Sequence, residues 1–258
     1  MNETFYGAVV RLLRSEGIRF LVGGAFAVRH YADIHRDTKD LDLFVRPQDA
    51  DRVIDACRRA GFDAEWVFSH WLAKIRLAED CIDVISRGAN GLCEVADSWF
   101  EHSSPGNLFD QQIFFCPAEE TLWMKAYVME RQRCDTADIV HIIRRQGREM
   151  DWKRLIALFG PDWELLLCHI TLFYFVYPGE GPIPRWVVDL LADQLRGRAD
   201  SSGAGSRVCR GTLISAVQYL PDVDRFGYLD ARLNDPRVKI DRSQIAAWKE
   251  NVLKADGN

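Results

Sequence analysis

The stretch from His35 to Val45 holds two aspartates, Asp40 and Asp42, two residues apart at the start of an apolar run. Side chains alternate between the two faces of a β-strand, so a strand here places both carboxylates on the same face. Two like charges at this spacing repel each other unless a cation lies between them, and carboxylate oxygens suit a hard ion such as magnesium. Acids also flank strands that bind no metal, and the pair alone is compatible with that interpretation.

Two other segments carry residues that fit a phosphate and metal site. Residues 20–22 are apolar and run into Gly23 and Gly24, which predicts a strand that ends in a glycine turn. Glycine lets backbone amides approach a phosphate closely, although a plain turn has the same sequence. Asp83 lies inside a second apolar run, residues 81–85, where an exposed position on an edge strand is the alternative. Together the three segments predict a metal-bound triphosphate site.

The spacing around the paired acids is Arg-x-Thr-x-Asp-x-Asp, formed by Arg36, Thr38, Asp40 and Asp42. With the glycine turn and Asp83, this pattern resembles the DNA polymerase β-like nucleotidyltransferase superfamily. Within that superfamily it is similar to the branch of AbiE-type toxins and minimal nucleotidyltransferases.

A second block downstream is similar to the helical lysine of that branch and to the Arg-Asp-x-x-Asp helix that follows it. The matching residues are Lys125, Asp135 and Asp138. Cys134 stands directly before the first of these aspartates, where the family often has a basic residue, although Arg133 is one position earlier. The resemblance covers residues 18 to 145.

For the strand acids, the resemblance implies a metal-dependent reaction. Asp40 and Asp42 would hold the magnesium ion that accompanies the nucleotide, or manganese in its place. Asp83 would be the third carboxylate, either as a ligand of a second ion or as the general base for the attacking hydroxyl. Gly23 and Gly24 would cradle the β- and γ-phosphates.

The resemblance also implies nucleotide contacts from Arg36, Thr38 and Lys125. Arg36 lies in the loop before the strand, and Thr38 would bond either the backbone or a phosphate. Lys125 would reach a phosphate from its helix, with Asp135 and Asp138 behind it on one helix face, where Asp138 could orient it through an ion pair. The alternative is that Lys125 extends its ammonium group into solvent and the acids only stabilise the start of a helix.

Composition limits the kinds of partner and compartment. The chain has 258 residues and a formal net charge of −5, so a long nucleic-acid footprint is not expected. Its seven cysteines are scattered without a Cys-x-x-Cys pair, which is typical of reduced thiols in a cytosolic protein. We expect no signal peptide, and the apolar stretch at 165–176 is too short to cross a bilayer. A cytoplasmic protein with no membrane partner is predicted.

The periodicity of apolar residues changes after Pro117. Before it, we expect helices at 3–16, 25–31 and 47–60, and strands at 19–22, 40–45, 62–68, 71–77 and 81–85. After it, we expect helices alone, at 119–132, 135–146, 151–159, 162–176, 184–197, 209–219 and 242–254. The predicted class is α+β: a nucleotidyltransferase domain at 1–117 with a mixed β-sheet flanked by helices, then a mostly α-helical domain at 118–258.

The leading hypothesis is a nucleotidyltransferase that moves an NMP from an NTP, such as ATP, to a hydroxyl group. The resemblance implies an RNA acceptor, such as the 3′ end of a tRNA, in a toxin-like role with a cognate antitoxin as partner. A small molecule or a protein is an alternative acceptor. A nucleotide-binding or interaction protein without catalysis is the alternative from another functional class.

Overall fold

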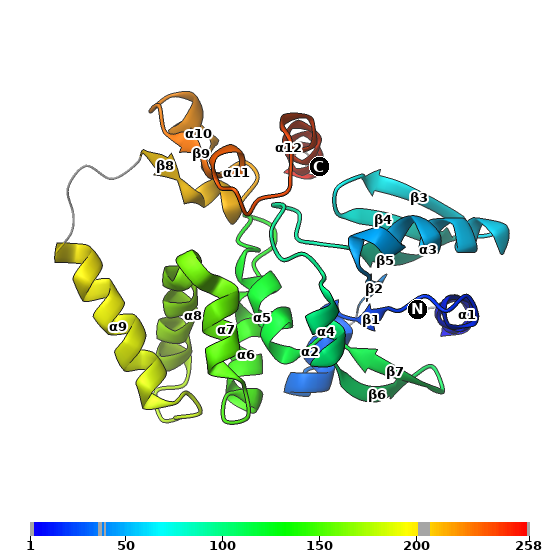
Figure 1. Cartoon of the computed structure of the whole chain (residues 1–258), viewed down its shortest axis with the longest axis horizontal. Coiled ribbons are helices and arrows are strands. Elements are labelled where there is room, and N and C mark those ends of the chain that lie inside the picture. Colours follow the sequence, from blue (N-terminus) through cyan, green and yellow to red (C-terminus); the bar gives the residue numbers. More distant parts are fainter. Residues whose placement is uncertain (1–2, 36–37, 39, 201–206, 257–258) are drawn as a thin grey trace. The chain divides into compact units, whose positions relative to one another are not determined.

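The computed structural model describes residues 3–35, 38, 40–200 and 207–256 (Figure 1). The chain forms two compact units, residues 1–117 with 236–251, and residues 118–235 with 252–258. The first unit contains the large β-sheet, and the second is mostly helical. The predicted α+β class is confirmed.

A seven-stranded mixed sheet forms the centre of the first unit, in the order β3-β4-β5-β2-β1-β7-β6. The strands are β1 (Leu21–Val22), β2 (Asp40–Phe44), β3 (Asp63–Phe68), β4 (Leu72–Leu77), β5 (Asp80–Ile85), β6 (Ser104–Leu108) and β7 (Gln111–Phe115). β2 is antiparallel to β1 and parallel to β5, whereas β4 is antiparallel to both β3 and β5. The strand with the paired aspartates is therefore central in the sheet.

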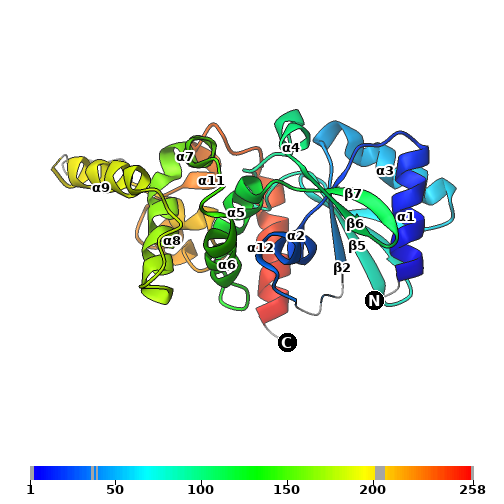
Figure 2. The same ribbon diagram turned by 90° about the horizontal axis from the view of Figure 1, so that it is seen from below.

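Helices cover the two faces of this sheet. They are α1 (Glu3–Ser15), α2 (Gly24–Ala32), α3 (Pro47–Arg59) and the short α4 (Asp97–Glu101). α1 and α3 lie together on one face, and α2 packs against β2 on the other (Figures 1 and 2). Pro47 begins α3, where its missing amide leaves no helical hydrogen bond unmade.

The side chains of β2 alternate as its sequence predicts. Leu41 and Leu43 are fully buried, and they pair in register with the buried Ile82 and Val84 of β5. These four side chains form part of the apolar core on the face away from α2. The intervening side chains of β2 point to the α2 face.

The C-terminal segment 236–251 belongs to the first unit and contains the start of α12 (Arg242–Asp256). Val238 and Ile245 are buried, and the Lys239 amide donates a 2.9 Å hydrogen bond to the Gly91 carbonyl. The sequence-based division placed all of 118–258 in one helical domain, and the structure differs from it in this segment. The division after residue 117 into separate domains stays a prediction.

The second unit packs its apolar side chains between short helices. These are α5 (Ala118–Ala126), α6 (Thr136–Gln146), α7 (Trp152–Phe159), α8 (Trp163–Val176), α9 (Arg185–Asp200), α10 (Leu220–Asp224) and α11 (Ala231–Asn234), with 3-10 turns at Gly160–Asp162 and Arg210–Leu213. Two short strands, β8 (Val208–Cys209) and β9 (Leu229–Asp230), pair in parallel. The fully buried core includes Leu122, Ile139, Phe159, Leu166 and Phe173.

One stretch of the described residues, Trp152–Val176, has the length and hydropathy of a membrane-crossing helix, and a third of its most apolar window is buried (33%). In the structure this stretch consists of α7, a 3-10 turn and α8, because Gly160 adopts a φ of +51°. It forms part of the helical core described above.

Two helix predictions differ from the structure, and one hairpin was missed. The helix predicted at 209–219 is wrong, because Val208–Cys209 pairs as a strand and only a 3-10 turn follows it. The helix predicted at 119–132 ends at Ala126, and the chain then makes a bridge between Met129 and Cys134. The hairpin of β6 and β7 was not predicted.

Candidate active site

The candidate site lies on the α2 face of the sheet in the first unit. Asp40 and Asp42 are half-buried on β2, while the leucines between and after them are fully buried on the opposite face. The two aspartates therefore share one face, as the period of two predicts.

Asp83 is brought beside the pair by the register of two parallel strands. Asp42 pairs with Asp83, and Asp40 pairs with Cys81. Neighbouring strands lie about 4.8 Å apart, and side chains in register point to the same face. The sheet therefore places Asp83 next to Asp42, although the two residues are far apart in sequence.

The glycine turn lies against the same strand and is tightly constrained. A Cβ atom on Gly24 would come within 1.6 Å of an Asp42 carboxylate oxygen, and Gly24 has a φ of +54°. A Cβ atom on Gly23 would come within 2.1 Å of the Phe44 ring. Glycine is required at both positions because the backbone passes directly over these two side chains of β2.

Only part of the predicted phosphate cradle is compatible with this geometry. The Gly23 amide donates a 3.0 Å hydrogen bond to the Asp42 carbonyl, so it is already used within the sheet. The Gly23 carbonyl accepts from Ala27 as the first helical bond of α2. The amides from Gly24 onward belong to the first turn of α2, where helical amides have no acceptor within the helix and favour anions.

Thr38 supports Asp40 directly. Its hydroxyl lies 2.9 Å from the Oδ1 atom of Asp40 and 3.1 Å from the Asp40 carbonyl. Thr38 therefore orients a predicted metal ligand in this structure, and its phosphate contact stays a prediction. Arg36, the other predicted nucleotide ligand of this loop, lies outside the residues that the structure describes.

Lys74 is the site residue that the sequence analysis missed. Its Nζ atom donates a 2.6 Å hydrogen bond to the Oδ1 atom of Asp83, with side chains that are 26% and 14% exposed. The Sγ atom of Cys81 lies 3.4 Å from the same oxygen. Burial lowers the pKa of Lys74, but the hydrogen bond and charge of Asp83, with Cys81 and Asp40, raise it further, and its pKa lies above the ordinary value. Lys74 is therefore charged at neutral pH.

A magnesium ion fits part of this donor set. Among the residues that the structure describes, no three His, Cys, Asp or Glu side chains are arranged to hold a metal ion. Magnesium at nucleotide sites is commonly held by one or two carboxylates together with phosphate oxygens and water. Asp40 and Asp42 supply such a pair, whereas Asp83 is ion-paired with Lys74.

Lys125, Asp135 and Asp138 come together in the second unit. The Nζ atom of Lys125 lies 2.8 Å from a carboxylate oxygen of Asp135 and 2.9 Å from one of Asp138. Lys125 and Asp135 side chains are each 11% exposed. Burial raises the pKa of Asp135, but the charge of Lys125 and the contacts of Arg133 lower it more, so its pKa lies below the usual range. The predicted ion pair is present, and the phosphate contact of Lys125 stays a prediction.

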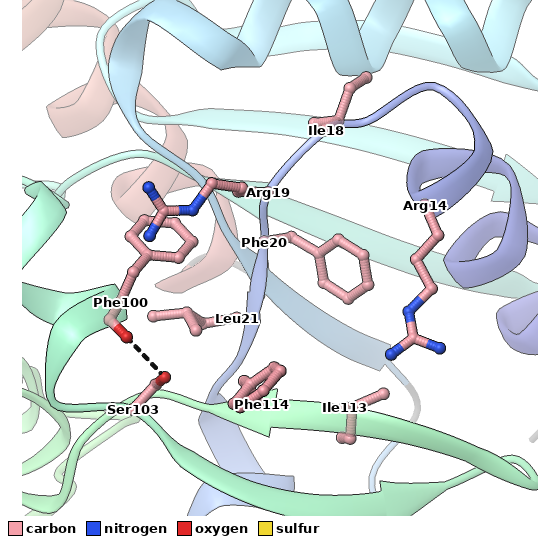
Figure 3. Close-up of a pocket in the computed structure, with 9 residues that line it drawn as sticks. All are labelled: Arg14, Ile18, Arg19, Phe20, Leu21, Phe100, Ser103, Ile113 and Phe114. Carbon is pink, nitrogen blue, oxygen red and sulfur yellow. Dashed lines mark hydrogen bonds between the residues drawn. The ribbon is translucent and has the colours of Figure 1, made fainter.

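A separate pocket of about 320 Å³ lies in the first unit (Figure 3). The guanidinium group of Arg19 lies over the Phe100 ring, 4.2 Å from its centroid. The pocket contains none of the predicted site residues. Its lining is formed by Arg14, Ile18, Arg19, Phe20, Leu21, Phe100, Ser103, Ile113 and Phe114.

Comparisons with solved structures give matches of low sequence identity. The antibiotic-resistance factor ANT(2'')-Ia is 13% identical, and the match covers 77% of this chain and 93% of that chain, with a TM-score of 0.40. The lincosamide antibiotic adenylyltransferase LnuA is 17% identical over 54% of this chain and 94% of its own, with a TM-score of 0.40. An antigenic nucleotidyltransferase-like protein from Paracoccidioides brasiliensis is 17% identical over 68% of this chain and 88% of its own, with a TM-score of 0.41. No family model matches the chain, and no curated protein matches it.

Proposed function

We propose that this protein is a metal-dependent nucleotidyltransferase that transfers an NMP from an NTP to a hydroxyl group of an acceptor. The observation that supports this most strongly is the placement of three carboxylates on one sheet face. Asp40 and Asp42 share a face of β2, Asp83 lies beside Asp42 in register, and Gly24 begins α2 against Asp42.

In the proposed reaction, the acceptor oxygen attacks the α-phosphorus of the NTP and forms a new P–O bond. The bond from the α-phosphorus to the oxygen that bridges to the β-phosphorus breaks, and pyrophosphate leaves with that electron pair. The proton of the acceptor hydroxyl passes to Asp83, which acts as general base. Asp40 and Asp42 would hold a magnesium or manganese ion, which supplies charge neutralisation for the phosphates when bound.

The nucleotide contacts belong to the same proposal. The first-turn amides of α2 would bind phosphate oxygens, since helix N-termini favour anions. Arg36, Thr38 and Lys125 would contribute as the family resemblance implies. Asp135 and Asp138 would hold Lys125 in place through the ion pairs already described.

The first acceptor that we propose is the one that the family resemblance implies. It is an RNA, such as the 3′ end of a tRNA, and the protein would then act in a toxin-like role with a cognate antitoxin. One observation favours a second candidate, a small molecule that carries positive charge. Among the described residues of β2 to β5, the sheet face that carries Asp40 and Asp42 brings five acidic side chains together with two basic ones, an acidic excess that disfavours a polyanion. In register these residues are Asp40, Asp42, Asp63, Glu65 and Asp83, with Lys74 and Arg76.

The test is to incubate the protein and magnesium with each α-³²P-labelled NTP and three acceptor pools: total RNA, total protein and small metabolites supplemented with polyamino sugars. We expect label in the RNA or metabolite pool and release of pyrophosphate. Binding of NTP without label in any pool would contradict enzymatic transfer and favour the non-catalytic alternative. Label in protein alone would contradict both proposed acceptors.

A further inference from the structure

The pocket of the first unit is separate from the candidate active site (Figure 3). Leu21 lines it and pairs with Phe44, the last residue of β2, whereas Asp40 is the first. At about 3.3 Å per residue, these two positions of β2 lie roughly 13 Å apart. Residues 18–20, which come before Leu21, are on the side away from the glycine turn. The pocket is therefore a second candidate binding site in this unit.

The pocket lies where β1 and β7 separate. β1 has two residues, and of these Val22 pairs with Phe115 of β7. Residues 18–20 run outside the sheet, so their side chains and those of β7 line a space between the two segments (Figure 3). Its volume of about 320 Å³ is at the lower end of the range for small-molecule sites, roughly 300–1,000 Å³. This size suits a ligand with one or two rings.

Three phenylalanine rings line the pocket and remain partly accessible. Phe20 and Phe100 are half-buried, and Phe114 is 45% exposed. They come from three separate segments, which are the stretch before β1, the helix α4 and the strand β7. Aromatic rings gain from stacked and edge-to-face contacts with other rings. The lining therefore favours a ligand that contains an aromatic ring.

Arg14 brings a positive charge to one side of these rings. Its guanidinium group donates a hydrogen bond to the Gln112 carbonyl, which is neutral, and it forms no ion pair within the described part of the chain. In the view of Figure 3, the Phe20 ring lies between Arg14 and Arg19. A guanidinium group binds a carboxylate through two parallel hydrogen bonds, so the polar end of a matching ligand is a carboxylate.

Arg19, the second arginine of the pocket, is only partly neutralised. It lies 3.3 Å from a carboxylate oxygen of Asp97, and Arg46 bonds the same oxygen at 2.9 Å. Asp49, the other partner of Arg46, is itself shared with Arg52. Three arginines thus face two aspartates in this network, and the described residues that line the pocket include no acid. The local charge is positive and favours an anion.

We propose that this pocket is a binding site for a small aromatic carboxylate. The ring of the ligand packs against Phe20 and Phe114, and its carboxylate pairs with Arg14. Arg19 adds a second positive charge on the other side. The site shares no residue with the candidate active site, so its occupation does not depend on the proposed nucleotidyl transfer.

The experiment measures binding to the full chain by saturation-transfer difference NMR, with line-broadening titrations for the dissociation constants. The probes are phenylacetate and indole-3-acetate. Their neutral amides keep the shape without the charge, and acetate keeps the charge without the ring. We expect both acids to bind the wild-type protein, and the amides and acetate to bind about tenfold more weakly or less, because each lacks one of the two contacts.

Two variants remove the two contacts one at a time, each with a matched control. Arg14→Met and Phe114→Ala should each weaken phenylacetate binding by about tenfold or more. Arg11→Met removes a charge from an exposed position of α1 outside the pocket, and it should keep the wild-type affinity. Phe175→Ala removes a ring that is 83% exposed in the second unit, and it should also leave the affinity unchanged.

A third variant, Asp97→Asn, tests the positive charge in the opposite direction. It removes the carboxylate that Arg19 shares with Arg46, so phenylacetate should bind more tightly. The Asp97 side chain is 59% exposed, so the amide does not disturb the core. Weaker binding by Asp97→Asn than by the wild-type protein would overturn the role of the arginines.

Two results on the wild-type protein alone would overturn the inference, whether or not any variant folds. These are equal binding of acid and amide, and no binding of either acid. Wild-type affinity in both Arg14→Met and Phe114→Ala would overturn it as well. So would a dimer in analytical ultracentrifugation that Phe114→Ala dissociates, because a second copy of the chain would then cover the pocket.

Discussion

Among single residues of the site, Gly24 tolerates a side chain least, because a Cβ atom there would come within 1.6 Å of an Asp42 carboxylate oxygen. We predict that Gly24→Ala lowers the free energy of unfolding by about 2 kcal/mol or more, since the new methyl group meets Asp42 and the backbone has a positive φ. The same substitution should reduce nucleotidyl transfer, because Asp42 must move. Urea denaturation and the transfer assay measure the two effects.

The control for Gly24→Ala is Gly17→Ala. Gly17 has a φ of +64°, but a Cβ atom there would meet nothing within 4 Å. Its substitution should therefore show the backbone strain alone, about 1 kcal/mol, with transfer unchanged. Equal effects of the two substitutions on stability and transfer would show that Asp42 does not pack over Gly24 as described.

Asp83→Asn tests the assignment of the general base. The amide keeps the shape of the side chain and an oxygen that Lys74 can bond, but it is a far weaker proton acceptor. We predict a loss of turnover of roughly 10²-fold or more with NTP affinity nearly intact, measured by steady-state kinetics and a binding titration. Weaker NTP binding with undiminished turnover at saturation would rule out this role.

Among the secondary-structure elements, the β4–β5 hairpin makes a contact that could have been predicted from the sequence, that of Lys74 with Asp83. The tight turn at residues 78–80 was predicted, and a loop of two residues, Ala78 and Glu79, pairs Leu77 with Asp80. Counting back along the hairpin places Lys74 opposite Asp83. The sequence signal for this contact is the length of the loop, because a short loop sets the register of the two strands. The periodicity of apolar residues alone does not give that register.

Other elements had no comparable local signal. The hairpin of β6 and β7 turns at Phe109 and Asp110, which both have a positive φ. Glycine or asparagine is the usual sequence signal for such a turn, and neither stands at these two positions. Residues 209–219 contain apolar side chains at helical spacing, but Thr212 and Leu213 are buried in a 3-10 turn that packs against α11. In both cases tertiary contacts outweigh local preference.

The pairing of α5 with α6 gives a prediction about Lys125. Lys125→Met leaves the buried carboxylates of Asp135 and Asp138 without their shared lysine. We predict a loss of about 3 kcal/mol or more in the free energy of unfolding, measured by urea denaturation. NTP affinity of the two proteins must then be compared without urea, at a temperature well below the unfolding temperature of the variant. Unchanged stability would show that the ion pairs are not maintained in solution.

Helix α8 gives a prediction about pH. His169 is fully buried there, and burial lowers its pKa to about 4. Between this value and the unfolded value of about 6.5, the unfolded chain binds more protons, so stability falls as the pH falls. We predict that acidification from pH 7 to pH 5 removes about 2 kcal/mol through His169. His169→Leu should lose correspondingly less over this range in urea titrations, and an identical loss would contradict the assignment.

At the scale of the whole molecule, the sequence predicted the α+β class and the order of most elements, because apolar periodicity and turn residues are local. It did not predict that residues 236–251 join the first unit, where Val238 and Ile245 are buried. That return of the chain depends on a surface built by residues far away in sequence, including Gly91. The three carboxylates were predicted from their sequence motifs. Their proximity in space follows from the register of β2 and β5, which the motifs do not contain.

Metal-dependent transfer is tested directly by following α-³²P label with the wild-type and Asp42→Asn proteins, each with magnesium and with chelator. Circular dichroism first establishes that both proteins are folded. We expect label on an acceptor only for the wild-type protein with magnesium, because Asp42 would hold the ion and stands in register with Asp83. Label transfer by Asp42→Asn at the wild-type rate, or full transfer in chelator, would contradict it.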